Sequence, residues 1–114
     1  MEVYRGYNSR NYPDNWGSPG NWVWVSNSPF YADNYARCVK GKMLEFDLDI
    51  KRLKPCEDRG NLSREQVEQR KAEGYNCFIR NFGYNPLGER ERGYCIFDFS
   101  LLTNERISVD YSTL

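Results

Sequence analysis

The stretch Trp22-Val23-Trp24-Val25-Ser26-Asn27-Ser28-Pro29-Phe30-Tyr31-Ala32 leads from a strand directly into a helix. Its opening run of aromatic and β-branched residues is typical of β-strands. Ser28 is a natural helix N-cap, and Pro29 suits the first helical position, where a backbone N–H would lack a partner. The sequence therefore predicts a strand at residues 22–26 and a helix at residues 29–39.

Strand-like patterns recur on both sides of this stretch, at residues 2–7, 43–50, 75–82, 94–99 and 106–111. The clearest is 43–50, where strict alternation predicts one buried and one acidic face, with Ile50 on the buried face. In the last strand we expect Ile107 and Val109 to face inward. Ser63 and Gln66 form a capping box, which predicts a second, charged helix at residues 64–73.

The order of these elements predicts an α+β fold, because strands outnumber helices and the last three strands are consecutive. We expect a small, split, mixed or antiparallel sheet with two helices. The chain has 114 residues, which fits one domain spanning residues 1–114. Residues 8–21, rich in Asn, Gly, Ser and Pro, are predicted to be a loop, and residues 83–93 a polar turn region.

The composition excludes several classes of function. There is no histidine, which removes Ser-His-Asp and Cys-His catalysis and any zinc site with histidine ligands. Sixteen Lys and Arg balance sixteen Asp and Glu, so a strongly cationic nucleic-acid binder is not expected. No apolar run is long enough for a membrane span, and the first residues lack a signal-peptide pattern, so we expect a cytoplasmic protein.

The four cysteines are spaced 18, 21 and 18 residues apart, with no Cys-x-x-Cys pair. In a cytoplasmic chain this spacing favours reduced, buried thiols over disulfides or a metal site, and no metal ligands are assigned. Nothing in the sequence places a cysteine beside an activating base.

Three groups of polar residues are candidates for binding or chemistry. Arg5, followed by Gly6, can clamp a phosphate or carboxylate where glycine lets a ligand approach the backbone; the alternative is an arginine stacked on tyrosine rings. The Ser26-Asn27-Ser28 segment opens a helix, which suits an anionic ligand; the alternative is ordinary capping by Ser28.

The third group is Glu89-Arg90-Glu91, which precedes the predicted strand at residues 94–99. Its acids can bind a sugar hydroxyl and stabilise positive charge that develops on a ribose; the alternative is solvated surface. Asp98 is a rival acid, because an acid inside an apolar strand requires a partner.

Together these segments resemble the ADP-ribosyltransferase fold. The resemblance rests on Tyr-Arg-Gly in the first strand, Trp-Val-Ser in the second, and the Ser-Pro-x-x-Ala-x-x-Tyr-Ala pattern of the helix. The Gly-Tyr-Asn turn at residues 74–76 adds to it. The absence of histidine leaves the Arg-Ser-Glu branch of that family and excludes the His-Tyr-Glu branch.

The resemblance implies a small, toxin-like or phage-encoded effector that uses NAD to ADP-ribosylate a protein of a host cell. It implies Glu91 as the catalytic acid, with Glu89 as the other acid of the pair. It also implies that the cofactor is bound by Tyr4, Arg5, Ser26, Asn27, Ser28, Tyr31 and Tyr35, with one of the helix tyrosines stacking on nicotinamide. The alternative is a non-enzymatic phage inhibitor, such as an anti-CRISPR protein, that blocks a protein partner.

Overall fold

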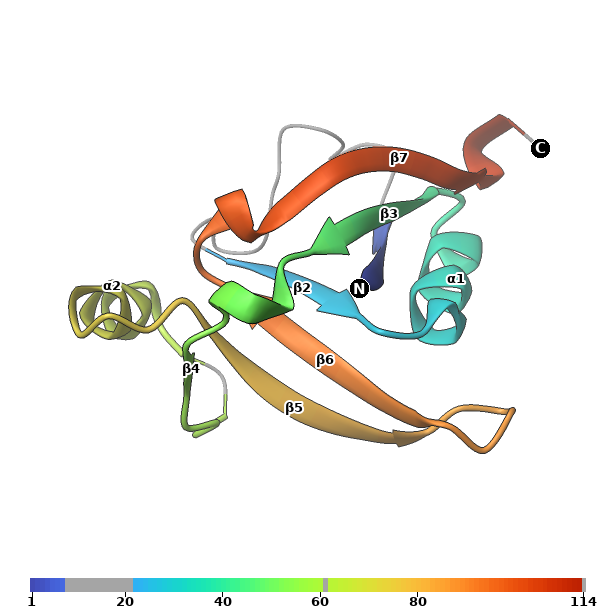
Figure 1. The fold of residues 1–114 in the computed structure, drawn as a ribbon. Helices are drawn as coiled ribbons and strands as arrows, with labels where there is room; N and C mark the ends of the chain where they lie inside the picture. The colour runs from blue at the N-terminus through green and yellow to red at the C-terminus, as the bar shows by residue number, and fades with distance from the viewer. Residues whose placement is uncertain (8–21, 61, 114) are drawn as a thin grey trace.

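The computed structural model of the chain describes residues 1–7, 22–60 and 62–113. The predicted loop at residues 8–21 lies outside these residues. Within them, seven strands form one mixed sheet in the order β4-β5-β6-β2-β1-β3-β7 (Figure 1). The strands are β1 (Glu2–Tyr7), β2 (Val23–Ser26), β3 (Lys42–Leu48), β4 (Pro55–Cys56), β5 (Cys77–Tyr84), β6 (Arg90–Ile96) and β7 (Leu102–Asp110).

Two helices, α1 (Pro29–Cys38) and α2 (Arg64–Ala72), complete an α+β fold, as predicted. The capping box of α2 is confirmed: the Gln66 backbone N–H donates to Ser63 Oγ at 3.2 Å, and the Ser63 N–H donates to Gln66 Oε1 at 2.8 Å. Val67 is the buried residue of this charged helix, which therefore attaches to the sheet through a narrow contact. Three 3₁₀ turns span Ile50–Arg52, Phe99–Leu101 and Tyr111–Thr113.

The predicted strand at residues 94–99 is wrong at both ends. β6 begins at Arg90, pairs with β5 from there, and stops at Ile96. The first half of β6 is polar and was therefore not predicted as a strand. It is polar because this part of the hairpin extends beyond the core, with Arg90 and Arg92 exposed. Asp98 is accordingly not inside a strand: it precedes the 3₁₀ turn and accepts a hydrogen bond from the Ser100 backbone N–H.

The predicted facing of two apolar residues is also wrong. Ile50 lies in a 3₁₀ turn after β3 and is exposed. Ile107 is 52% exposed rather than inward. The pairing of β3 with β7 shifts register twice, between Met43 and Leu44 and between Glu45 and Asp47, and each shift changes which β7 residues face the core.

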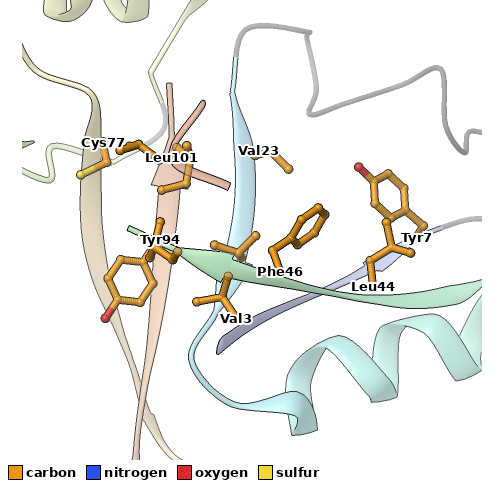
Figure 2. Close-up of a cluster of buried hydrophobic side chains, with 11 residues drawn as sticks. Val3, Tyr7, Val23, Leu44, Phe46, Cys77, Tyr94 and Leu101 are labelled. Carbon is orange, nitrogen blue, oxygen red and sulfur yellow. The ribbon is translucent and has the colours of Figure 1, made fainter. Parts of the chain in front are cut away.

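The main core lies where the two halves of the sheet face one another. β1 and β2 are joined at one residue pair, Tyr4 with Ser26, within the described part of the chain. Buried side chains from β1, β2 and β3 then pack in one cluster with those of β5 and β6 (Figure 2). The cluster comprises Val3, Tyr7, Val23, Val25, Leu44, Phe46, Leu48, Cys77, Tyr94, Ile96 and Leu101.

Helix α1 covers part of the other face of the sheet, and α2 lies at the end of the sheet near β4 (Figure 1). Helix α1 lies against β1 and buries Ala32 and Ala36. A Cβ atom at Gly6 would lie 2.4 Å from the Ala32 carbonyl oxygen, so glycine is required for the helix to approach this closely. A side chain at Gly6 would thus meet the helix, whereas the predicted approach of a ligand to the Gly6 backbone stays a prediction. Val67 of α2 packs in a separate buried cluster that includes Phe78 and Cys95.

Candidate functional site

A cleft of about 350 Å³ lies beside α1 on the helix-covered face of the sheet. Its polar lining is Tyr4, Arg5, Ser26, Tyr31, Tyr35 and Arg80, and its apolar lining includes Trp24 and Phe82. These residues come from β1, β2, α1 and β5. Two arginines and no carboxylate line the cleft among the described residues, so it suits an anionic ligand with an aromatic group.

The order of the strands brings these residues together. Arg80 of β5 is opposite Gly93 of β6, Gly93 is opposite Ser26 of β2, and Ser26 is opposite Tyr4 of β1. Directly opposed residues share a face of a sheet. Arg80, Ser26 and Tyr4 therefore lie on one face, along one row that crosses four strands.

Arg5 enters the cleft at the junction of β1 and β2. Its Nη1 donates to the Trp24 carbonyl oxygen at 2.9 Å, and its guanidinium lies 4.8 Å from the centre of the Tyr7 ring. The stacked arginine of the alternative reading is thus present. The same side chain lines the cleft, and its buried Nε has no hydrogen-bond partner among the described residues. A buried donor without a partner is costly, so the position of Arg5 carries a penalty in stability.

Ser26 and Glu91 form a buried pair beside the cleft. Ser26 Oγ donates to Glu91 Oε1 at 3.0 Å and accepts from the Ser28 backbone N–H at 3.2 Å. Ser26 is 3% exposed and Glu91 is 7% exposed. Ser26 lines the cleft, whereas Glu91 lies behind it in β6. The sequence separated Glu91 from its strand, and the structure corrects this because β6 starts at Arg90, one residue before Glu91.

Asn27 links the end of β2 to β6 through two hydrogen bonds. Its Nδ2 donates to the Arg90 carbonyl at 3.2 Å, and its Oδ1 accepts from the Arg92 backbone N–H at 2.8 Å. Asn27 therefore does not line the cleft, and its contacts hold the two strands beside Glu91 in place.

Ser28 occupies the N-cap position of α1, but its side chain makes no capping hydrogen bond, so the interpretation of ordinary side-chain capping is wrong. Its Oγ instead accepts from Asn85 Nδ2 at 3.3 Å. Asn85 Oδ1 also accepts from the backbone N–H groups of Leu87 and Glu89, which shapes the end of the β5–β6 hairpin. Glu89 is exposed at that end and lies outside the cleft.

Aromatic rings form one wall of the cleft. Tyr31 stacks on Phe82, with ring centroids 5.5 Å apart, and Phe82 lies 5.9 Å from Trp24. The Phe82 ring also lies over Gly93, where a Cβ atom would meet it at 2.2 Å. Tyr35 is the second helix tyrosine of this lining and is partly exposed.

Four residues of the site were missed from the sequence: Trp24, Arg80, Phe82 and Asn85. Trp24 was used as part of the strand and of the Trp-Val-Ser motif but was not assigned to the site, and Asn85 falls in the predicted turn region. Arg80 and Phe82 belong to the alternating pattern of β5 together with Phe78, which was a usable signal. Arg80 and Phe82 belong to the site because β5 lies next to β6 in the sheet, and no local sequence pattern shows that position.

The cysteines are separate from the cleft. Cys56, Cys77 and Cys95 are buried and Cys38 is exposed, all as free thiols. Burial raises the pKa of the Cys77 thiol to about 11 and raises the pKa values of Cys56 and Cys95 as well. High pKa values disfavour the reactive thiolate. Among the described residues, no three His, Cys, Asp or Glu side chains are placed to hold a metal ion.

Comparison of the chain with protein-family models, curated proteins and solved structures found no match in any of the three. In the described part of the chain, no helix has the length and apolar character needed to cross a membrane.

Proposed function

We propose that the cleft binds NAD and that the protein transfers the ADP-ribose group to a side chain of a target protein. The observation that carries the proposal is the convergence of Arg5 and Ser26 in one cleft, with Glu91 hydrogen-bonded to that serine. An ADP-ribosyltransferase of the Arg-Ser-Glu type requires these three residue types together. The three residues are 21 and 65 positions apart along the chain, so their convergence is a property of the fold.

The chemistry of the lining is consistent with this ligand. Arg5 lines the cleft with a positive charge that can attract a phosphate group, and the aromatic wall beside Tyr31 offers a face for the nicotinamide ring. Ser26, with Asn27 and Ser28 behind it, supports the nicotinamide ribose. The ribose is the reacting group, and Glu91 lies directly behind Ser26, so its carboxylate acts on the ribose electrostatically across that serine.

In the proposed reaction, the bond between the nicotinamide nitrogen and the anomeric carbon breaks, and nicotinamide leaves with the electron pair. Glu91 stabilises the positive charge that develops on the ribose. Glu89 orients the target side chain, which forms the new bond to the anomeric carbon and releases a proton. Rigid placement of these groups supplies much of the rate enhancement, because the reacting atoms meet in a fixed geometry.

The test is incubation with labelled NAD and a cell lysate, followed by measurement of labelled protein bands and of released nicotinamide. Glu91→Gln keeps the size of the side chain and removes its charge, so we expect labelling to fall by roughly 100- to 1,000-fold. Glu105→Gln removes an exposed glutamate from β7 and serves as the matched control with unchanged labelling. If the wild type neither labels protein nor releases nicotinamide, the proposal is wrong.

A second candidate is a non-enzymatic inhibitor that blocks a protein partner. The supporting observation is the apolar end of the β5–β6 hairpin, where Tyr84 and Leu87 are each 71% exposed. This function needs no NAD. Capture of a partner from lysate that is unaffected by NAD, by Arg5→Gln and by Glu91→Gln, but lost in Tyr84→Ser, favours the inhibitor over the enzyme.

A further inference from the structure

Arg80 is a second cation of the cleft that the proposed function leaves without a role. It lines the cleft from β5, whereas Arg5 lines it from β1. In the sheet, β6 and β2 lie between these two strands. Three strand spacings of about 4.8 Å place the two backbones roughly 14 Å apart, so the two arginines line the cleft from well-separated strands.

The guanidinium of Arg80 is held in a fixed orientation. Its Nε and Nη2 each donate to one carboxylate oxygen of Asp58, both at 3.0 Å. Its plane packs against aromatic rings, 5.0 Å from the centre of Trp24 and 5.5 Å from the centre of Phe78. The side chains of Arg80 and Asp58 are 29% and 27% exposed, so solvent reaches the pair only in part. Its Nη1 donates no hydrogen bond to the described residues, and this leaves donor capacity for a ligand.

A purely structural ion pair does not require these features. Asp58 is not among the cleft-lining residues, so the acid stands behind Arg80 and the cation faces the cavity. Arginine recognises phosphate through several parallel donors, and a guanidinium fixed beforehand loses little freedom on binding. An arginine stacked on Trp24 also lies beside the aromatic wall that would take a base or a nicotinamide ring.

We propose that Arg80 and Arg5 form a two-arginine site for a diphosphate group, in which Arg80 is a specificity-determining residue and Asp58 positions it. This inference rests on the proposed function to the extent that the diphosphate belongs to NAD. The same site takes a free nucleoside diphosphate, because the recognised group is the diphosphate itself.

Calorimetric titration with NAD, ADP and adenosine tests the proposal. Arg80→Gln removes one charge-assisted contact, and we expect it to weaken the binding of ADP and of NAD by roughly 10- to 100-fold. Adenosine lacks phosphate, so its affinity should be unchanged in the variant. Arg52→Gln is the matched control: it removes an arginine of the Ile50–Arg52 3₁₀ turn that pairs with Asp49 at 3.8 Å and does not line the cleft, and ADP binding should not change.

Asp58→Asn separates a ligand-binding role from a structural one. It breaks the same ion pair as Arg80→Gln but leaves the arginine charge in the cleft, so only the positioning is lost and ADP affinity should fall by less than in Arg80→Gln. If both variants weaken ADP binding equally, or if adenosine loses affinity together with ADP, the pair is structural and the proposal is overturned.

The outcomes also separate this proposal from the proposed function. ADP binding that depends on Arg80, with no turnover of NAD, supports the diphosphate site and refutes the transferase. Turnover of NAD with unchanged diphosphate affinity in Arg80→Gln supports the transferase and refutes the second-arginine site.

Discussion

Replacement of Ser26 by alanine isolates the contribution of the buried serine–glutamate pair to stability. The substitution removes the hydroxyl that donates to Glu91 Oε1 at 3.0 Å. Glu91 is 7% exposed, so water cannot readily replace the lost donor. A buried acceptor left without a partner costs about 1–3 kcal/mol, and more when it is charged. We expect a loss of about 3 kcal/mol in the free energy of unfolding at pH 7, and roughly 12 °C in melting temperature.

Urea denaturation followed by circular dichroism measures this change, with Ser100→Ala as the matched control. Ser100 Oγ donates to Asp98 at 2.7 Å, but Asp98 is 45% exposed and water can take the place of the hydroxyl. The control should lose less than about 1 kcal/mol. If Ser26→Ala loses no more than Ser100→Ala, then Glu91 does not depend on Ser26, and the buried pair cannot be what holds the glutamate beside the cleft.

Three further predictions concern close packing and ionisation. Gly6→Ala should destabilise the protein by about 1–3 kcal/mol in urea denaturation, because its Cβ would lie 2.4 Å from the backbone oxygen of Ala32 and α1 must move; an unchanged midpoint would contradict this packing. Gly93→Ala should cost less, because it displaces only the side chain of Phe82, and yet should weaken NAD binding by reshaping the aromatic wall; unchanged affinity in a calorimetric titration would exclude that wall from the ligand site. The pKa of Cys77 is about 11 in the folded state against an ordinary 9.0. Above pH 9 the unfolded thiol ionises while the folded one stays largely protonated, so stability should fall by roughly 2 kcal/mol between pH 9 and 11, and Cys77→Val should lose less stability over the same range.

Local patterns were sufficient to predict most of the elements. The strand at β1 was predicted over its observed range, and β3 within two residues at its C-terminal end, because alternation along one strand reports burial of one face. Helix α2 was located by the capping box at Ser63 and Gln66, which acts between residues three positions apart. These features depend on neighbours in the chain, so a single sequence contains them.

Features that depend on distant segments were missed. The first half of β6 is polar because the hairpin extends past the core, so its pairing with β5 is visible only in three dimensions. Ile107 faces outward because of register shifts against β3, which alternation within β7 cannot reveal. The residues of the candidate site also fall into these two groups, those recognised from local sequence and those placed by distant segments. Arg5 and Ser26 were selected from local context, whereas Arg80 is beside them only because β5 and β6 lie next to β2.

The position of β1 in the sheet has a consequence for folding during synthesis. β1 lies between β2 and β3, and β3 in turn pairs with β7, whose residues are added about 60 positions later. The β5–β6 hairpin, by contrast, closes between neighbouring segments. On the ribosome, the hairpin can therefore pair within moments of emerging, while β3 keeps an open edge until β7 is made. A long-range partner of this kind slows folding and leaves an unpaired strand edge exposed in the meantime. The nascent chain should thus be most prone to aggregation, and most dependent on chaperones, in the interval before Asp110 leaves the exit tunnel.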